Sequence, residues 1–189
     1  ISPSMIVTLR RIAKQYDIIH VHHPDPMACL ALFLSGFKGK VVLHWHSDIL
    51  KQKVLLKFYR PLQEWLIKRA DVIVPNMTEA AFLTDTPYRH TMTDEKDILH
   101  LCEKLMELGP KQVILTGVRP DEGHLGPACY DGKKLHIYAP PHVPKQYDGT
   151  GDVFASVLLG GLMQGLPPES SAELAADFTR VCVEASMMN

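Results

Sequence analysis

Hydrophobic positions in the first part of the chain alternate between helical spacing and short β-branched runs. The spacing predicts helices over 5–15, 24–34 and 53–68, and strands over 18–22, 40–46 and 70–74. Ser4 is expected to cap the first helix, and Gly36 to end the second. Repeated alternation of this kind implies parallel strands joined by crossover helices.

The second part continues the alternation and adds a hairpin. Helices are expected over 78–83, 93–108, 152–165 and 170–187, and a strand over 112–118. Asp131-Gly132 marks a tight turn between short antiparallel strands at 127–130 and 134–138. The prediction is an α/β fold of three-layer α/β/α, Rossmann-like type, with a mainly parallel sheet and a short antiparallel hairpin near one edge.

Composition narrows the classes of partner. Among 189 residues, 20 basic and 21 acidic side chains leave a formal charge of -1, which provides no basic field for nucleic acid. No apolar stretch is long enough to cross a bilayer, so we expect no membrane insertion. The four cysteines form no Cys-x-x-Cys pair, which favours a reducing, cytoplasmic setting. The opening Ile1-Ser2-Pro3-Ser4 lacks an initiator methionine and a signal pattern, so the chain is expected to begin within something longer.

The motif Gly149-Thr150-Gly151-Asp152 stands where an irregular loop becomes a helix. Backbone N–H groups and the positive end of the helix dipole converge there, which favours an anion such as phosphate. Glycines permit close approach of the main chain, and Asp152 could take a proton from an attacking hydroxyl. The simpler alternative is a loop followed by an N-capping aspartate.

A second polar motif follows the strand predicted at 70–74. Asn76 and Glu79 form a pair suited to arranging a hydrated magnesium ion and phosphates. Alternatively, Asn76 is a turn residue after the strand, and Glu79 is an acid favoured in the first turn of a helix.

These two motifs together resemble the signature pair of the ribokinase-like superfamily. The segments 78–88 and 151–156 further resemble bacterial pyridoxal kinases, and the resemblance covers residues 75–189. It implies ATP and Mg²⁺ as cofactors and a pyridoxal-like acceptor, with no direct protein ligands to a metal. It also implies that Asp152 is the base for the 5′-hydroxyl and that Gly149, Thr150 and Gly151 form an anion hole. By the same resemblance, Asn76 and Glu79 organise magnesium and phosphate. Thr116 and Gly117 are expected near the nucleotide.

Residues 1–74 resemble a different family, the N-terminal domain of the GT-B glycosyltransferases of family four. The resemblance is carried by Tyr16-Asp17-Ile18-Ile19-His20-Val21-His22, His44-Trp45-His46-Ser47-Asp48 and Lys68-Arg69-Ala70-Asp71-Val72-Ile73-Val74. It implies that His46, Asp48 and Lys51 lie at an interdomain cleft. The tryptophans Trp45 and Trp65 are expected to be packing residues.

Histidines on the two predicted strands offer a further alternative. His20 and His22 share one strand face, His44 and His46 share another, and His23 is adjacent. Zinc would suit such ligands, but no spacing fixes a tetrahedral set. Histidines at the ends of parallel strands also commonly line a cleft, and we favour this interpretation.

The chain is therefore expected to be a composite of segments 1–74 and 75–189, or one continuous α/β domain in which strands 18–22 and 40–46 lie beside 71–75. The predicted function is an ATP-dependent kinase of pyridoxal kinase type. Its activity is expected to be impaired, because the resemblance omits the half that supplies most pyridoxal contacts in that family. The alternatives are a glycosyltransferase fragment and a folded chimera that binds nucleotide or phosphate without turnover. The oligomeric state stays open.

Overall fold

The computed structural model describes residues 3–46, 53–87, 94–145 and 147–187. Its helices are α1 (Ser4–Ile12), α2 (Pro26–Ser35), α3 (Lys53–Arg69), α4 (Met77–Leu83), α5 (Glu95–Glu107), α6 (Thr150–Met163) and α7 (Pro168–Met187), with a short 3-10 turn, η1 (Ala13–Gln15). Its strands are β1 (Ile18–His23), β2 (Lys40–Trp45), β3 (Val72–Val74), β4 (Gln112–Val118), β5 (Gly126–Tyr130) and β6 (Leu135–Ile137). The predicted cleft residues Asp48 and Lys51 lie outside the described ranges.

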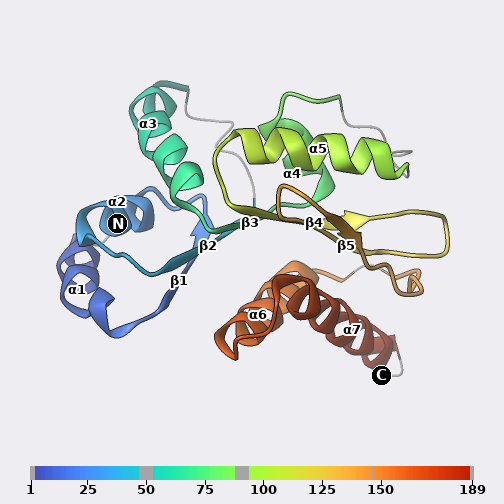
Figure 1. The fold of residues 1–189 in the computed structure, drawn as a ribbon. Helices are drawn as coiled ribbons and strands as arrows, with labels where there is room; N and C mark the ends of the chain where they lie inside the picture. Colours follow the sequence, from blue (N-terminus) through green and yellow to red (C-terminus); the bar gives the residue numbers. More distant parts are fainter. Residues whose placement is uncertain (1–2, 47–52, 88–93, 146, 188–189) are drawn as a thin grey trace.

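The six strands form one sheet in the order β1-β2-β3-β4-β5-β6. The first four are parallel, and β5 and β6 continue antiparallel to one edge. The strands of the first segment therefore lie beside β3, with Val42 paired to Val72. This arrangement confirms the predicted α/β class and the hairpin near one edge (Figure 1).

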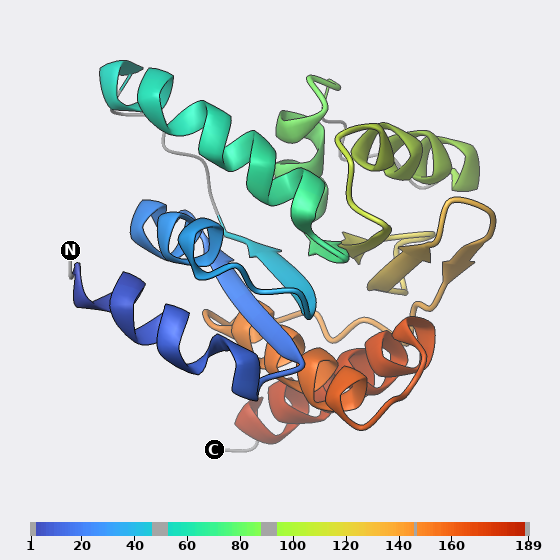
Figure 2. The same ribbon diagram turned by 60° about the vertical axis from the view of Figure 1, so that its left-hand side comes forward.

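Helices cover the sheet on both faces, which makes three layers. One core contains side chains from α2, α3, α4 and α5 packed on one face, and Leu9 of α1 joins it. The other core lies beneath α6 and α7, where Phe154 and Leu158 pack on Val42, Val74 and Ile114. Figure 2 shows α3 and α5 on one side of the sheet and α6 and α7 on the other. Among the described residues, no helix combines the length and apolar character needed to span a bilayer.

Local chemistry explains where the helices begin and end. Asp25 caps α2 by accepting the N–H groups of Met27 and Ala28, and Gly36 ends it in the left-handed conformation with φ of 68°. The prediction for Ser4 was wrong, because α1 already begins at Ser4 and Pro3 is the N-cap, with no capping hydrogen bond from a side chain.

Asp71, just before β3, connects three parts of the sheet layer. One of its carboxylate oxygens accepts the Val41 N–H at 2.8 Å and Arg69 Nη1 at 3.2 Å. The other accepts Lys111 Nζ at 2.6 Å, from the approach to β4. Its backbone N–H donates to the Val41 carbonyl, so the main chain and the side chain of Asp71 both form hydrogen bonds with the backbone of Val41.

Candidate active site

The carboxyl ends of the parallel strands and the start of α6 surround an open cleft of about 1040 Å³. Ligands commonly bind at this edge of an open α/β sheet. The predicted site residues that line the cleft are His46, Asn76, Glu79, Thr116, Gly117, Gly149, Thr150, Gly151 and Asp152. The structure thus brings together residues that the sequence had divided between two resemblances.

The glycine loop forms the N-terminus of α6. Gly149 is the N-cap, with φ of 85°, so Asp152 lies in the first turn and is not the cap. The first N–H groups of a helix have no acceptor within it, and those of Thr150, Gly151 and Asp152 belong to this set. A Cβ built on Gly149 or Gly151 would meet no atom within 4 Å, so the loop leaves open space beside these N–H groups. This geometry suits a phosphate group.

Asn76 and Glu79 form a reciprocal capping box at the start of α4. Asn76 Oδ1 accepts the Glu79 N–H at 2.9 Å, and Glu79 Oε2 accepts the Asn76 N–H at 2.8 Å. Both residues therefore have a local structural role at the start of the helix, as in the alternative interpretation, and the same two side chains also line the cleft. One carboxylate and one amide fit a magnesium ion that keeps several waters and is held mainly by phosphates.

Thr116 and Gly117 lie within β4, where the pairing with β5 shifts register. The Thr116 N–H donates to the Pro75 carbonyl at 2.9 Å, which places Thr116 beside Asn76. Gly117 has φ of 78°, a conformation that side chains rarely adopt. Both residues line the cleft.

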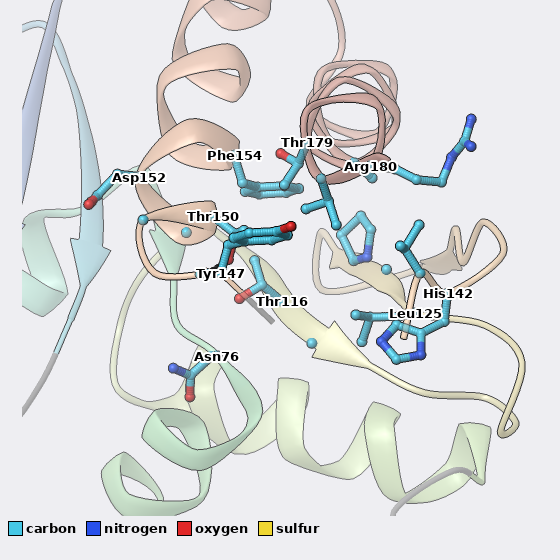
Figure 3. Close-up of a pocket in the computed structure, with 18 of the residues that line it drawn as sticks. Asn76, Thr116, Leu125, His142, Tyr147, Thr150, Asp152, Phe154, Thr179 and Arg180 are labelled. Atoms are coloured by element: carbon cyan, nitrogen blue, oxygen red, sulfur yellow. Dashed lines mark hydrogen bonds between the residues drawn. The ribbon is translucent and has the colours of Figure 1, made fainter. Parts of the chain in front are cut away.

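Several further cleft residues were missed by sequence reasoning. They are Arg119, Leu125, His142, Tyr147, Phe154, Thr179 and Arg180. Figure 3 shows Tyr147, Phe154 and Thr179 gathered on one side of Thr150, whereas Asp152 points away from them. Two of them had a signal in the sequence: Tyr147 lies two residues before the predicted glycine motif, and Phe154 lies two residues after it.

Asp152 faces the ends of β1 and β2. Its side chain is 65% exposed, and its Oδ1 lies 3.8 Å from His46 Nε2. A candidate general base needs access to the acceptor hydroxyl, which this exposure provides. The cleft therefore has two sides: one beside Tyr147 and Phe154, and one beside Asp152 and His46.

Histidines cover the sheet face next to Asp152. Burial, followed by the neighbouring imidazoles of His46, His20 and His22, lowers the pKa of His44 to about 3. Burial and the nearby His22 and His46 lower the pKa of His20 to about 4. Burial and His22 also lower the pKa of His46, and Asp152 acts in the opposite direction. His20 and His44 are therefore neutral at neutral pH. Trp45 is buried in the core, as predicted, and stacks on His23 with ring centroids 3.7 Å apart.

A mainly parallel α/β sheet with an antiparallel hairpin at one edge and a glycine loop at a helix N-terminus defines the ribokinase-like class of α/β protein. Within this class, the chain belongs to the phosphomethylpyrimidine kinase family, whose model matches residues 49–188. The model of glycosyltransferase family four matches residues 1–87, so the two matches overlap over 49–87. Each segment therefore matches the family that its motifs resemble, and the kinase match covers the larger part of the chain.

Curated relatives divide in the same way. A hydroxymethylpyrimidine/phosphomethylpyrimidine kinase from Bacillus subtilis is 31% identical over 128 residues, covering 67% of this chain and 46% of the relative. The D-rhamnosyltransferase WbpZ from Pseudomonas aeruginosa is 40% identical over 73 residues, covering 39% of this chain and 19% of the relative. The chain thus spans about half the length of the kinase and a fifth of the glycosyltransferase.

Solved structures agree on a ribokinase-like fold. A Bacteroides thetaiotaomicron protein, named as a phosphomethylpyrimidine kinase, gives a TM-score of 0.79 at 25% identity, covering 99% of this chain and 68% of that one. An orthorhombic crystal form of that protein contains pyridoxal. Pyridoxal kinase from Lactobacillus plantarum gives a TM-score of 0.77 at 23% identity, covering 98% of this chain and 68% of that one, and it shows the shared fold. The Bacillus subtilis pyridoxal kinase structure is an ADP complex.

Proposed function

We propose that this chain transfers a phosphoryl group from ATP to the hydroxymethyl group of a small heterocycle such as pyridoxal or a hydroxymethylpyrimidine. The observation that carries the proposal is the placement of the α6 glycine loop and Asp152 on one cleft with Asn76, Glu79 and Thr116. The relatives named for pyridoxal and hydroxymethylpyrimidine support this acceptor class.

In this proposal, the N–H groups at the start of α6 stabilise charge on the transferred phosphoryl group. Asp152 accepts the proton of the acceptor hydroxyl, whose oxygen forms the new bond to the γ-phosphorus. The bond from that phosphorus to the bridging oxygen breaks, and ADP leaves. Magnesium, organised through Asn76 and Glu79, would neutralise charge on the phosphates. Thr116 and Gly117 would border the nucleotide.

The acceptor side explains why turnover is expected to be impaired. Asp152 faces His44 and His46, which belong to the segment that resembles a glycosyltransferase. A pocket that positions an acceptor poorly loses rate steeply, because catalysis depends on near-attack geometry. We therefore propose slow transfer combined with intact nucleotide binding.

The test combines ligand-induced stabilisation with a transfer assay. MgATP at 100 times its dissociation constant should add about 2.7 kcal/mol to the free energy of unfolding. Asp152→Asn should keep this stabilisation and lose phosphoryl transfer by about 100-fold or more, the usual contribution of a general base.

Asp97→Asn, at an exposed position of α5 on the opposite face of the sheet, is the matched control and should change neither quantity. Transfer that survives Asp152→Asn would refute the assigned base. Stabilisation by MgATP without detectable transfer in the unaltered chain would favour the nucleotide-binding chimera instead.

A further inference from the structure

Three histidines and one aspartate converge at the acceptor side of the cleft. His22 lies near the end of β1, His44 and His46 lie at the end of β2, and Asp152 lies in the first turn of α6. One potential ligand atom from each of the four lies within 4.8 Å of the others. The cluster therefore joins the sheet to the helix on its open face.

The backbone fixes the core of this cluster. His22 and His44 are register partners on adjacent parallel strands. His44 is only 7% exposed, and its Nδ1 is buried with no hydrogen-bond partner among the described residues. A buried polar atom without a partner costs free energy, which a bound ligand can recover. This orphaned nitrogen is an observation independent of the spacing of the four residues.

We propose that His22, His44, His46 and Asp152 form a binding site for a divalent transition metal ion of the zinc type. Three imidazoles and one carboxylate are a ligand set typical of tetrahedral zinc. Magnesium prefers oxygen ligands, so this site and the magnesium organised by Asn76 and Glu79 differ in chemistry.

Binding requires a modest rearrangement. Ligand atoms around tetrahedral zinc lie about 3.3 Å apart. Pairs of ligand atoms that are now farther apart, up to 4.8 Å, must therefore move together, and the pair from His22 and His46 must move apart. His22 Nδ1 and His46 Nε2 lie 2.6 Å apart and share a hydrogen bond. For both atoms to ligate the ion, the shared proton moves to the other nitrogen of its own ring. His22, His46 and Asp152 are exposed, so their side chains have room to adjust.

The site combines residues of both segments. The three histidines precede residue 49, where the kinase family match begins, and Asp152 lies beyond residue 87, where the glycosyltransferase match ends. Neither segment alone holds the four ligands. A zinc ion bound here would occupy Asp152 and prevent it from accepting a proton, a consequence that rests on the proposed function. Added zinc should then inhibit transfer.

Cobalt binding to the metal-free full chain tests the site without reference to activity. Co²⁺ should bind one equivalent with the visible absorption bands of four-coordinate cobalt, and Zn²⁺ should displace it. His22→Gln and His46→Gln should each weaken affinity by about 100-fold or more, because even changes to residues behind the ligands cost 10–100-fold. His100→Gln, exposed on α5, is the matched control and should leave the affinity unchanged.

Thermal unfolding without metal establishes that each variant is folded. Equal affinity of His46→Gln and His100→Gln would overturn the site, as would six-coordinate cobalt or a thiolate absorption band from Cys182. Because nucleotide is absent from the titration, its result is independent of the kinase proposal. Cobalt binding with no transfer would refute the kinase alone, and transfer without cobalt binding would refute the metal site alone.

Discussion

Two glycines at the start of α6 meet different physical demands, and substitution by alanine separates them. Gly149 has φ of 85°, where an L-residue costs about 1–2 kcal/mol, so Gly149→Ala should lower the free energy of unfolding by that amount. Gly151 is helical, so Gly151→Ala should leave the fold intact or stabilise it by up to about 1 kcal/mol. The added methyl group should nevertheless obstruct the phosphate and reduce stabilisation by MgATP. Denaturant unfolding with and without MgATP measures both effects.

Gly160→Ala, further along the same helix, is the control for helix propensity. Its Cβ would meet nothing within 4 Å, so it should add up to about 1 kcal/mol and leave the MgATP effect unchanged. If Gly151→Ala responds to MgATP as fully as Gly160→Ala does, the proposed phosphate loop is wrong.

Individual site residues were predictable where their chemistry is local. Gly149 and Asp152 stand in one short motif, and Asn76 and Glu79 have the three-residue spacing of a capping box. Thr179 gave no such signal, because it reaches the cleft only through the packing of α7. The approach of His46 to Asp152 was also unpredictable, since it depends on how α6 lies across β2.

At the scale of elements, α6 and α7 meet through a close glycine contact. A Cβ on Gly161 would lie 2.7 Å from Ser171 Oγ and 2.9 Å from Ser171 Cβ, and Ser171 is fully buried. Gly161→Ala should therefore separate the helices and destabilise the chain by about 1–3 kcal/mol. Because α7 carries Thr179 and Arg180 into the cleft, MgATP stabilisation should fall as well.

Gly160→Ala again supplies the comparison, since the same change one residue earlier meets open space. Ser171→Gly combined with Gly161→Ala should restore part of the lost stability by removing the opposing side chain. A Gly161→Ala variant as stable as Gly160→Ala would show that the two helices are not in close contact.

Elements were predictable because hydrophobic spacing and turn residues agree along most of the chain. The turn at Asp131-Gly132 is one example: Asp131 Oδ1 accepts the N–H groups of Lys133 and Lys134, and Gly132 has φ of 88°. The failure at Ser4 has a similar local cause, since a serine can occupy the first helical turn as well as the cap. The bulge in β4 was not foreseen, because register depends on the partner strand.

At the scale of the whole molecule, the two segments share one sheet and contribute to the same buried clusters on its two faces. Val21 and Leu43 of the first segment belong to the same buried cluster as Ile98 and Leu115 of the second. Separating the segments would expose this shared apolar surface, which is the main driving force of folding. We therefore propose one continuous domain that unfolds as a unit.

The contacts of Asp71 provide the test of this unity. Asp71→Ala leaves the N–H of fully buried Val41 without its side-chain acceptor, which should cost about 1–3 kcal/mol. Lys111→Ala is the control, because this lysine is 74% exposed and such ion pairs contribute about 0–1 kcal/mol.

Both tryptophans lie in the first segment, so their fluorescence follows that segment, whereas circular dichroism also follows the helices of the second. The two probes should give coincident transitions that shift together in Asp71→Ala, because a single cooperative unit has one midpoint. A fluorescence transition that moves alone would mean that the segments fold independently, and that the cleft between His46 and Asp152 is not held by a common core.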